Sequence, residues 1–133
     1  MQTVLMIPRV NLVLGWLWIL LSFLTGMVIG LFFHKENWLG GYTSLRRRMY
    51  RLGHISLAAL GAVNILFFFT ARLLVPGSPL VTLGSFSFIV GAITMPLCCL
   101  VMAHAPKAHL VFSIPVISLL TAGVVTLLAV LQL

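Results

Sequence analysis

The chain has 133 residues, of which 62% are hydrophobic and only 7% are charged. An average soluble domain carries roughly 25% charged residues, so this composition excludes an ordinary water-soluble fold. The length suits one domain. The formal net charge of +7 comes from basic residues that stand beside apolar runs, which indicates a membrane surface rather than nucleic acid.

Four uncharged apolar segments follow one another along the chain. Each has about the ~20 residues that a helix needs to cross the hydrocarbon core of a bilayer. The alternation typical of strands is absent, and lipid leaves few other ways to satisfy the backbone. The sequence therefore predicts an all-α protein, one domain over 1–133, built as an antiparallel bundle of four transmembrane helices at residues 10–33, 52–71, 80–103 and 110–133.

The basic residues predict how the bundle is oriented. Most of them lie in the first or the last connection between helices: Lys35, Arg46, Arg47, Arg48, Arg51 and Lys107. Positive residues concentrate on the cytoplasmic side of membrane proteins. We therefore expect a multi-pass protein of a prokaryotic cytoplasmic membrane, with both basic connections in the cytoplasm and both termini outside.

All four histidines, His34, His54, His104 and His109, fall on this same basic side, near the ends of predicted helices. In an up-down bundle the first and third helices are diagonal, as are the second and fourth. His54 and His109 would then approach the bundle axis from opposite sides, and so would His34 and His104. Two facing imidazoles suit the axial positions of a haem b iron. The pair of His54 and His109 is preferred, because the other two histidines lie at helix ends that fray.

Residues around His54 fit the same hypothesis. Arg47 and Arg51 precede it on one helical stripe, where they could neutralise haem propionates. Gly61 lies two turns beyond it and offers the small surface that a porphyrin needs where its plane approaches a helix. A histidine at a membrane interface is also stable there without any ligand, so interfacial packing stays open as the alternative.

Small and polar residues within the spans predict helix packing. Gly26 and Gly30 have the small-xxx-small spacing that lets two helices approach closely. Asn64 lies roughly 15 Å beyond His54 along its helix, at 1.5 Å per residue. A buried amide at that depth predicts a hydrogen bond to another helix, with a grip on a quinone carbonyl as the alternative.

Sulfur-containing residues gather before the last connection. Cys98 and Cys99 stand between Met95 and Met102, and His104 follows. Soft sulfur ligands with histidine select Cu(I), which makes copper handling a third hypothesis. Buried cysteine and methionine are also ordinary core residues.

Catalytic patterns of soluble enzymes are missing. The chain has no Gly-rich phosphate loop, and Glu36 is its only acidic residue, so paired carboxylates are excluded. Whether the protein is an enzyme stays open, but an accessory or electron-carrying subunit is favoured over a self-contained catalyst.

The segment RRRMYRLGHISLAALGAVNILFF, with MPLCCL and HLVFSIPV further along, resembles small four-helix integral membrane proteins of bacteria. The histidine layout also resembles membrane b-type cytochromes in a general way, which implies haem b and electron transfer. It departs from the di-haem pattern, in which paired histidines recur within one helix at opposite membrane depths. One haem layer at most is therefore expected.

The leading hypothesis is a small integral membrane subunit of a larger respiratory or electron-transfer complex. It would hold one haem b near the cytoplasmic face through His54 and His109, and would exchange electrons with a quinone or a neighbouring cofactor. The alternative is a structural or assembly subunit that binds no cofactor and packs against larger membrane partners.

Overall fold

The computed structural model describes residues 2–133, with side chains from Pro8 onward, and this part of the chain is helical without strands. The long helices are α1 (Gln2–Phe32), α2 (Leu45–Ala71), α3 (Pro79–His104) and α4 (Ser113–Val130). Two short 3₁₀ helices lie in the connections: η1 (Trp38–Gly40) and η2 (Pro106–Phe112). Four helical stretches are long and apolar enough to cross a membrane: Pro8–Phe32, Leu45–Ala71, Pro79–His104 and Pro106–Val130. The prediction of an all-α bundle of four transmembrane helices is confirmed.

The predicted boundaries are close for α3 and too late for α2. This helix begins at Leu45 rather than near residue 52, because Ser44 caps it. The Ser44 hydroxyl accepts a hydrogen bond from the backbone N–H of Arg47 at 3.1 Å, which satisfies one of the orphan donors of the first turn. The arginines expected in the connection therefore belong to the first two turns of α2. His109 lies in η2, before α4 begins at Ser113.

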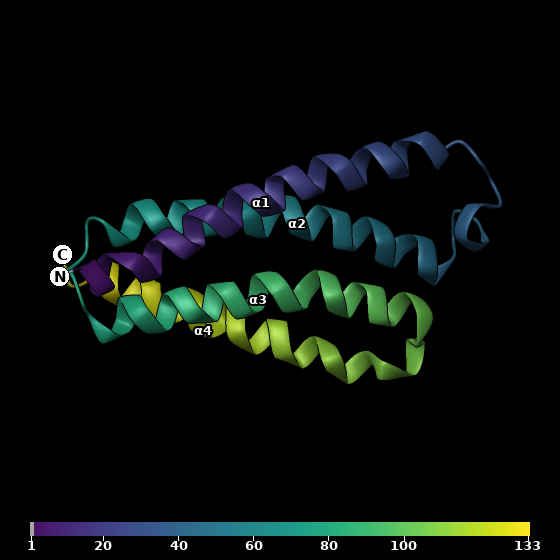
Figure 1. Cartoon of the computed structure of the whole chain (residues 1–133). Coiled ribbons are helices and arrows are strands. Elements are labelled where there is room, and N and C mark those ends of the chain that lie inside the picture. The colour runs from purple at the N-terminus through teal and green to yellow at the C-terminus, as the bar shows by residue number, and fades with distance from the viewer. Residues whose placement is uncertain (1) are drawn as a thin grey trace.

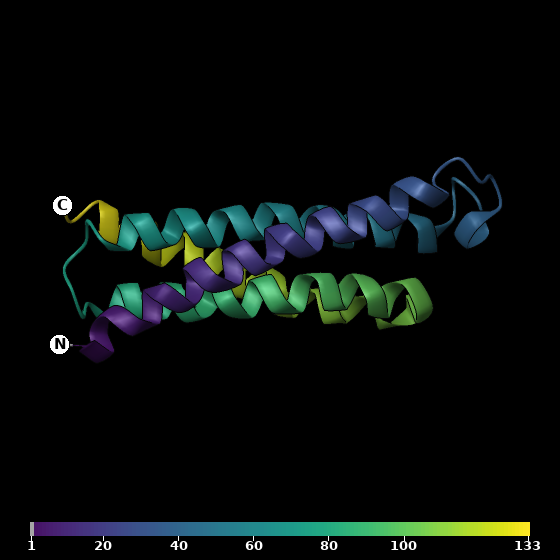
Figure 2. The same cartoon turned by 45° about the horizontal axis from the view of Figure 1, so that its top comes forward.

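Successive helices run in opposite directions, and each packs along the next one, with both termini at the same end of the bundle (Figure 1). Figure 2 shows that α1 crosses the bundle obliquely, starting beside α3 and ending away from it. The interface between α1 and α3 is much smaller than the interfaces between successive helices. Among the described residues α1 and α4 form no interface of similar size. This arrangement differs from the expected square bundle, in which the first and third helices are diagonal.

The apolar core lies toward the end that carries the termini. The rings of Phe67 on α2 and Phe88 on α3 meet at an angle of 55° with centroids 5.2 Å apart, and the same buried cluster includes Ala122 and Ala129 of α4. Most large apolar side chains of α1 and α4 are exposed instead. Outward apolar faces of this kind are what contact with a lipid bilayer requires.

α1 and α2 come closest at two glycines. A Cβ atom built on Gly15 would lie 2.7 Å from the backbone oxygen of Gly61, and one built on Gly61 would lie 2.8 Å from the oxygen of Gly15. No side chain fits at such distances, so the crossing depends on both glycines. The sequence predicted that a porphyrin could lie against Gly61, but α1 fills the space beside this residue.

Candidate functional site

A buried polar network joins three helices toward the end that carries the termini. The side-chain nitrogen of Asn11 on α1 donates to the side-chain oxygen of Asn64 on α2 at 2.8 Å and approaches the backbone oxygen of Ser85 on α3 at 3.3 Å. The Ser85 hydroxyl donates back to the Asn11 side-chain oxygen. All three residues are fully buried. The interhelical hydrogen bond predicted for Asn64 is confirmed, and its partner amide comes from the first span.

His54 lies on the face of α2 that packs against α1. Its Nδ1 lies 3.1 Å from the Thr25 hydroxyl and 3.5 Å from the Ser22 hydroxyl. A Cβ atom on Gly26 would lie only 2.8 Å from the ring atom Cε1, so the imidazole fits because this residue is glycine. The ring therefore occupies a notch in α1, formed by one turn of that helix.

The two hydroxyls beside Nδ1 also contact backbone oxygens. Thr25 donates its hydrogen to the backbone oxygen of Leu21 at 2.8 Å, and Ser22 donates to the backbone oxygen of His54 at 3.4 Å. A hydroxyl hydrogen rotates to suit its partners, so each hydroxyl can accept a hydrogen bond from a protonated Nδ1 or donate one to an unprotonated Nδ1. The geometry therefore fits both tautomers of the ring. Among the described residues Nε2 has no hydrogen-bond partner, and it lies 3.3 Å from the position that a Cβ atom would take on Gly26.

The other histidines have separate surroundings. The Tyr50 hydroxyl lies 3.1 Å from Nε2 of His104, and the two rings meet edge to face. His34 and His109 are exposed. Within residues 8–133 no hydrogen bond or ring contact joins one histidine to another, and η2, which carries His109, packs against α3 and α4. Pairing of His54 with His109, or of His34 with His104, stays a prediction.

Arg47 is fully buried at the basic end. Its guanidinium donates to the backbone oxygens of Phe33, by a short hydrogen bond, and of Lys35 at 3.2 Å, in the segment that directly follows α1. The same group lies over the rings of Tyr42, Phe33 and Trp38, with centroid distances of 3.9, 4.9 and 5.5 Å. Two of its nitrogens thus donate to backbone oxygens. The predicted interaction of Arg47 with a haem propionate gains no support from these contacts. Arg51 is exposed.

The two cysteines are free and buried, and they face different neighbours. The Cys98 thiol donates to the backbone oxygen of Val111 at 3.2 Å, whereas Cys99 packs against Gly53 of α2. Across residues 8–133 no three histidine, cysteine or acidic side chains come close enough to hold a metal ion. Copper handling therefore gains no geometric support.

Comparison with protein-family models, with curated proteins and with solved structures finds no match to this chain. The resemblances to bacterial four-helix membrane proteins and to b-type cytochromes accordingly stay predictions.

Sequence reasoning missed the residues on α1 that complete both polar sites. Asn11 pairs with Asn64, and Ser22 and Thr25 hold the ring of His54. A signal was present for Asn11, because an amide inside an apolar span needs a partner. Serine and threonine gave no such signal, since in a helix each can bond to its own backbone.

Proposed function

We propose that the chain is a small integral membrane subunit of a bioenergetic complex and binds one haem b, with His54 as an axial ligand. The hydroxyl groups beside Nδ1 of that ring carry the proposal. A histidine that binds a metal typically donates its other ring N–H to a hydrogen-bond acceptor, which fixes the tautomer and the ring orientation. The Thr25 and Ser22 hydroxyls can serve as these acceptors for Nδ1 of His54, and no hydrogen bond to its Nε2 is found among the described residues.

Two further residues near this ring fit a flat anionic cofactor. Gly30 lies one turn beyond Gly26 on α1, and a Cβ atom built there would meet no heavy atom within 4 Å. Arg51 lies one turn before His54 on α2, and it is exposed and hydrogen-bonds to no described side chain. Open space beside a helix and a free guanidinium are what a porphyrin and its propionates need. A bound haem would supply one-electron transfer with a quinone or a neighbouring cofactor.

The proposal assigns one axial ligand and leaves the second to experiment. His109 lies in η2 on the α3–α4 side, and the packing of η2 does not bring it to α2. The concentration of arginine and lysine around this end further supports a cytoplasmic location for the histidines, by the preference of positive residues for that side.

Absorbance of the purified full-length chain tests the proposal. The dithionite-reduced minus oxidised spectrum, with pyridine haemochrome quantification, is expected to give one b-type haem per chain. His54→Ala should abolish the signal while the protein still elutes as an intact species in detergent. Alanine variants of His34, His104 and His109 are the matched controls, and a second variant that loses the haem identifies the other axial ligand.

Two results would overturn the proposal. One is an intact wild-type chain, made with ample haem, that has no Soret band. The other is a His54→Ala variant that keeps the full signal. Thr25→Val gives a finer test, because loss of the acceptor at Nδ1 should shift the reduction potential of a haem bound to Nε2. Thr94→Val is its control, since Thr94 bonds only to its own helix, at the backbone oxygen of Val90.

A structural subunit without cofactor is the second candidate, and one observation favours it. The ring of His54 fills the notch that Gly26 leaves, so helix packing alone accounts for both residues. A flat spectrum combined with loss of stability in His54→Ala would support this function. Gly26→Leu, which cannot leave room for the ring, should then separate α1 from α2 and abolish assembly with the partner proteins.

A further inference from the structure

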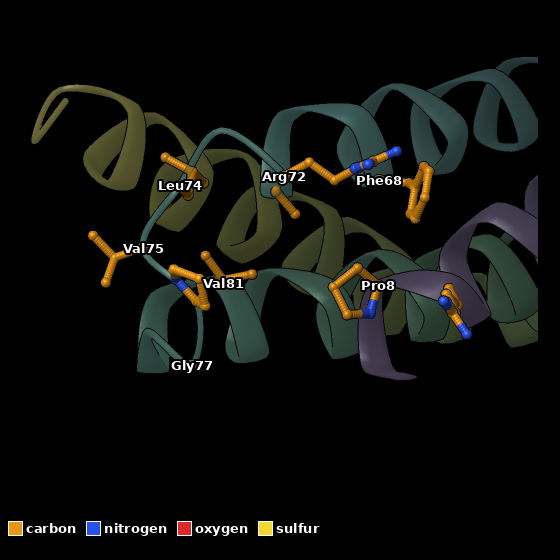
Figure 3. Close-up of a pocket in the computed structure, with 10 residues that line it drawn as sticks. Pro8, Phe68, Arg72, Leu74, Val75, Gly77 and Val81 are labelled. Atoms are coloured by element: carbon orange, nitrogen blue, oxygen red, sulfur yellow. The ribbon is translucent and has the colours of Figure 1, made fainter. Parts of the chain in front are cut away.

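Two arginines lie at the end of the bundle opposite the histidines. They line a cavity of about 260 Å³ between the start of α1 and the α2–α3 connection. Figure 3 shows Phe68 on α2 and Arg72 directly after its end, with Pro8 of α1 across from them and Val75 in the connecting segment. Arg9 completes the charged lining. The cavity is thus walled by three elements that are far apart in sequence.

The connecting turn gives this cavity a defined outer wall. The N–H of Ser78 donates to the carbonyl of Val75 at 3.2 Å, which closes a four-residue turn with Pro76 and Gly77 at its centre. Gly77 has φ of +79°, a conformation that a type II turn requires at its third position and that glycine adopts without strain.

Both guanidinium groups are available to a ligand. Arg9 and Arg72 are exposed, and neither side chain makes a hydrogen bond to a described residue. Arg72 only stacks over Phe68, with its guanidinium carbon 5.9 Å from the ring centroid. Glu36, the one acidic residue of the chain, lies in the connection after α1, at the other end of the bundle. No acidic side chain therefore lies beside this pair of positive charges.

An apolar groove adjoins the charged cavity and shares Arg9 with it. It has a volume of about 460 Å³ and continues along α1 over Val10, Val13, Leu14 and Leu17. From Arg9 to Leu17 a helix rises about 12 Å at 1.5 Å per residue. This length covers most of one leaflet, since half of a hydrocarbon core is about 15 Å.

We propose that this end of the bundle binds an anionic phospholipid, with its phosphate between Arg9 and Arg72 and an acyl chain along the α1 groove. Arginine holds phosphate by paired N–H···O bonds, and the two guanidinium groups stand where the spans begin and end. A free inorganic phosphate would use the cavity but not the groove. The groove therefore favours a ligand with an acyl chain. The two arginines, which have no acidic side chain beside them, favour a negatively charged headgroup.

The binding experiment uses the full chain in detergent, titrated with phosphatidylglycerol, phosphatidylcholine or inorganic phosphate and observed by native mass spectrometry. Phosphatidylglycerol should bind preferentially, with one lipid retained per chain. Arg9→Gln and Arg72→Gln should each weaken that binding roughly fivefold, which corresponds to ~1 kcal/mol for one basic residue near an anionic lipid. Arg48→Gln is the matched control, because Arg48 is exposed at the opposite end and should leave the site unchanged.

A second variant tests the apolar part of the site separately. Val13→Trp fills the groove and leaves both arginines in place, so it should weaken the long-chain lipid and spare a short-chain phosphatidylglycerol. Equal retention of phosphatidylcholine and phosphatidylglycerol would overturn the proposal, as would an equal loss in Arg48→Gln. Saturation by inorganic phosphate without any lipid preference would assign the cavity to a soluble anion instead.

Discussion

Replacement of Asn11 by leucine tests the energetic weight of the buried polar network. The substitution keeps the approximate shape of the side chain and removes its bonds to the Asn64 side chain, the Ser85 backbone and the Ser85 hydroxyl. An interhelical hydrogen bond in a membrane contributes about 0.6 kcal/mol on average and up to about 1.7 kcal/mol. The larger cost comes from the side chains left unpaired, since a buried polar group without a partner costs about 1–3 kcal/mol.

We expect Asn11→Leu to lower the free energy of unfolding by about 2–4 kcal/mol, because it leaves the Asn64 oxygen and the Ser85 hydroxyl unpaired. Asn64→Leu should cost less, about 1–2 kcal/mol, because Asn11 keeps its contacts with Ser85. The combined replacement of Asn11, Asn64 and Ser85 by apolar residues should cost less than the sum of the single changes. No unpaired polar side chain would then be left.

The assay is reversible unfolding in mixed micelles, titrated with sodium dodecyl sulfate and followed by circular dichroism. Thr94→Val is the control, because Thr94 bonds only within its own helix and should change stability by less than about 0.5 kcal/mol. Two outcomes contradict the reasoning. The first is an Asn11→Leu variant whose free energy of unfolding changes as little as that of the control. The second is a triple variant whose loss of unfolding free energy equals the sum of the three single losses.

Two other substitutions test how α1 is attached to the bundle. Gly61→Ala should destabilise the protein by about 1–3 kcal/mol in the same titration, since the added Cβ would lie 2.8 Å from the Gly15 oxygen, whereas Gly123→Ala has open space and should be neutral or stabilising. Arg47→Met should free the end of α1 and speed proteolysis of the segment before α2, an effect that Arg48→Met, at an exposed position, should not produce. Equal proteolysis of the two methionine variants would show that Arg47 does not hold this segment.

The spans could be predicted from the sequence because hydropathy over about 20 residues is a local property. The start of α2 was placed too late because its arginines were interpreted as a polar connection. Ser44 was the available signal, as a cap three residues before Arg47. The burial of Arg47 could not be predicted, since it depends on carbonyls of Phe33 and Lys35 that only the fold brings to it.

The partners of the histidines were harder to predict than their depth. Position along a span gives depth directly, but a shift of one residue rotates a side chain by about 100° around the helix. His54 faces α1 rather than the α4 side, because Gly26 leaves room for the ring and the Thr25 hydroxyl lies within hydrogen-bond distance of Nδ1. The asparagine pair was partly predictable, as Asn64 required a partner, but nothing in the sequence singled out the helix that supplies it.

α1 is attached to the rest of the bundle by different contacts along its length. Among the residues with described side chains, hydrogen bonds link α1 to α3 through Asn11 and through the indole of Trp18, which donates to the Ala92 carbonyl at 2.8 Å. Further along, the ring of His54 holds α1 to α2, and the end of α1 is held by Arg47. Nε2 of that ring lies beside Gly26, 3.3 Å from the position that a Cβ atom would take there, so a ligand on Nε2 would have to enter between α1 and α2. The binding of a haem at His54 would therefore depend on movement of α1, in the part of this helix that is attached to α2 and not to α3.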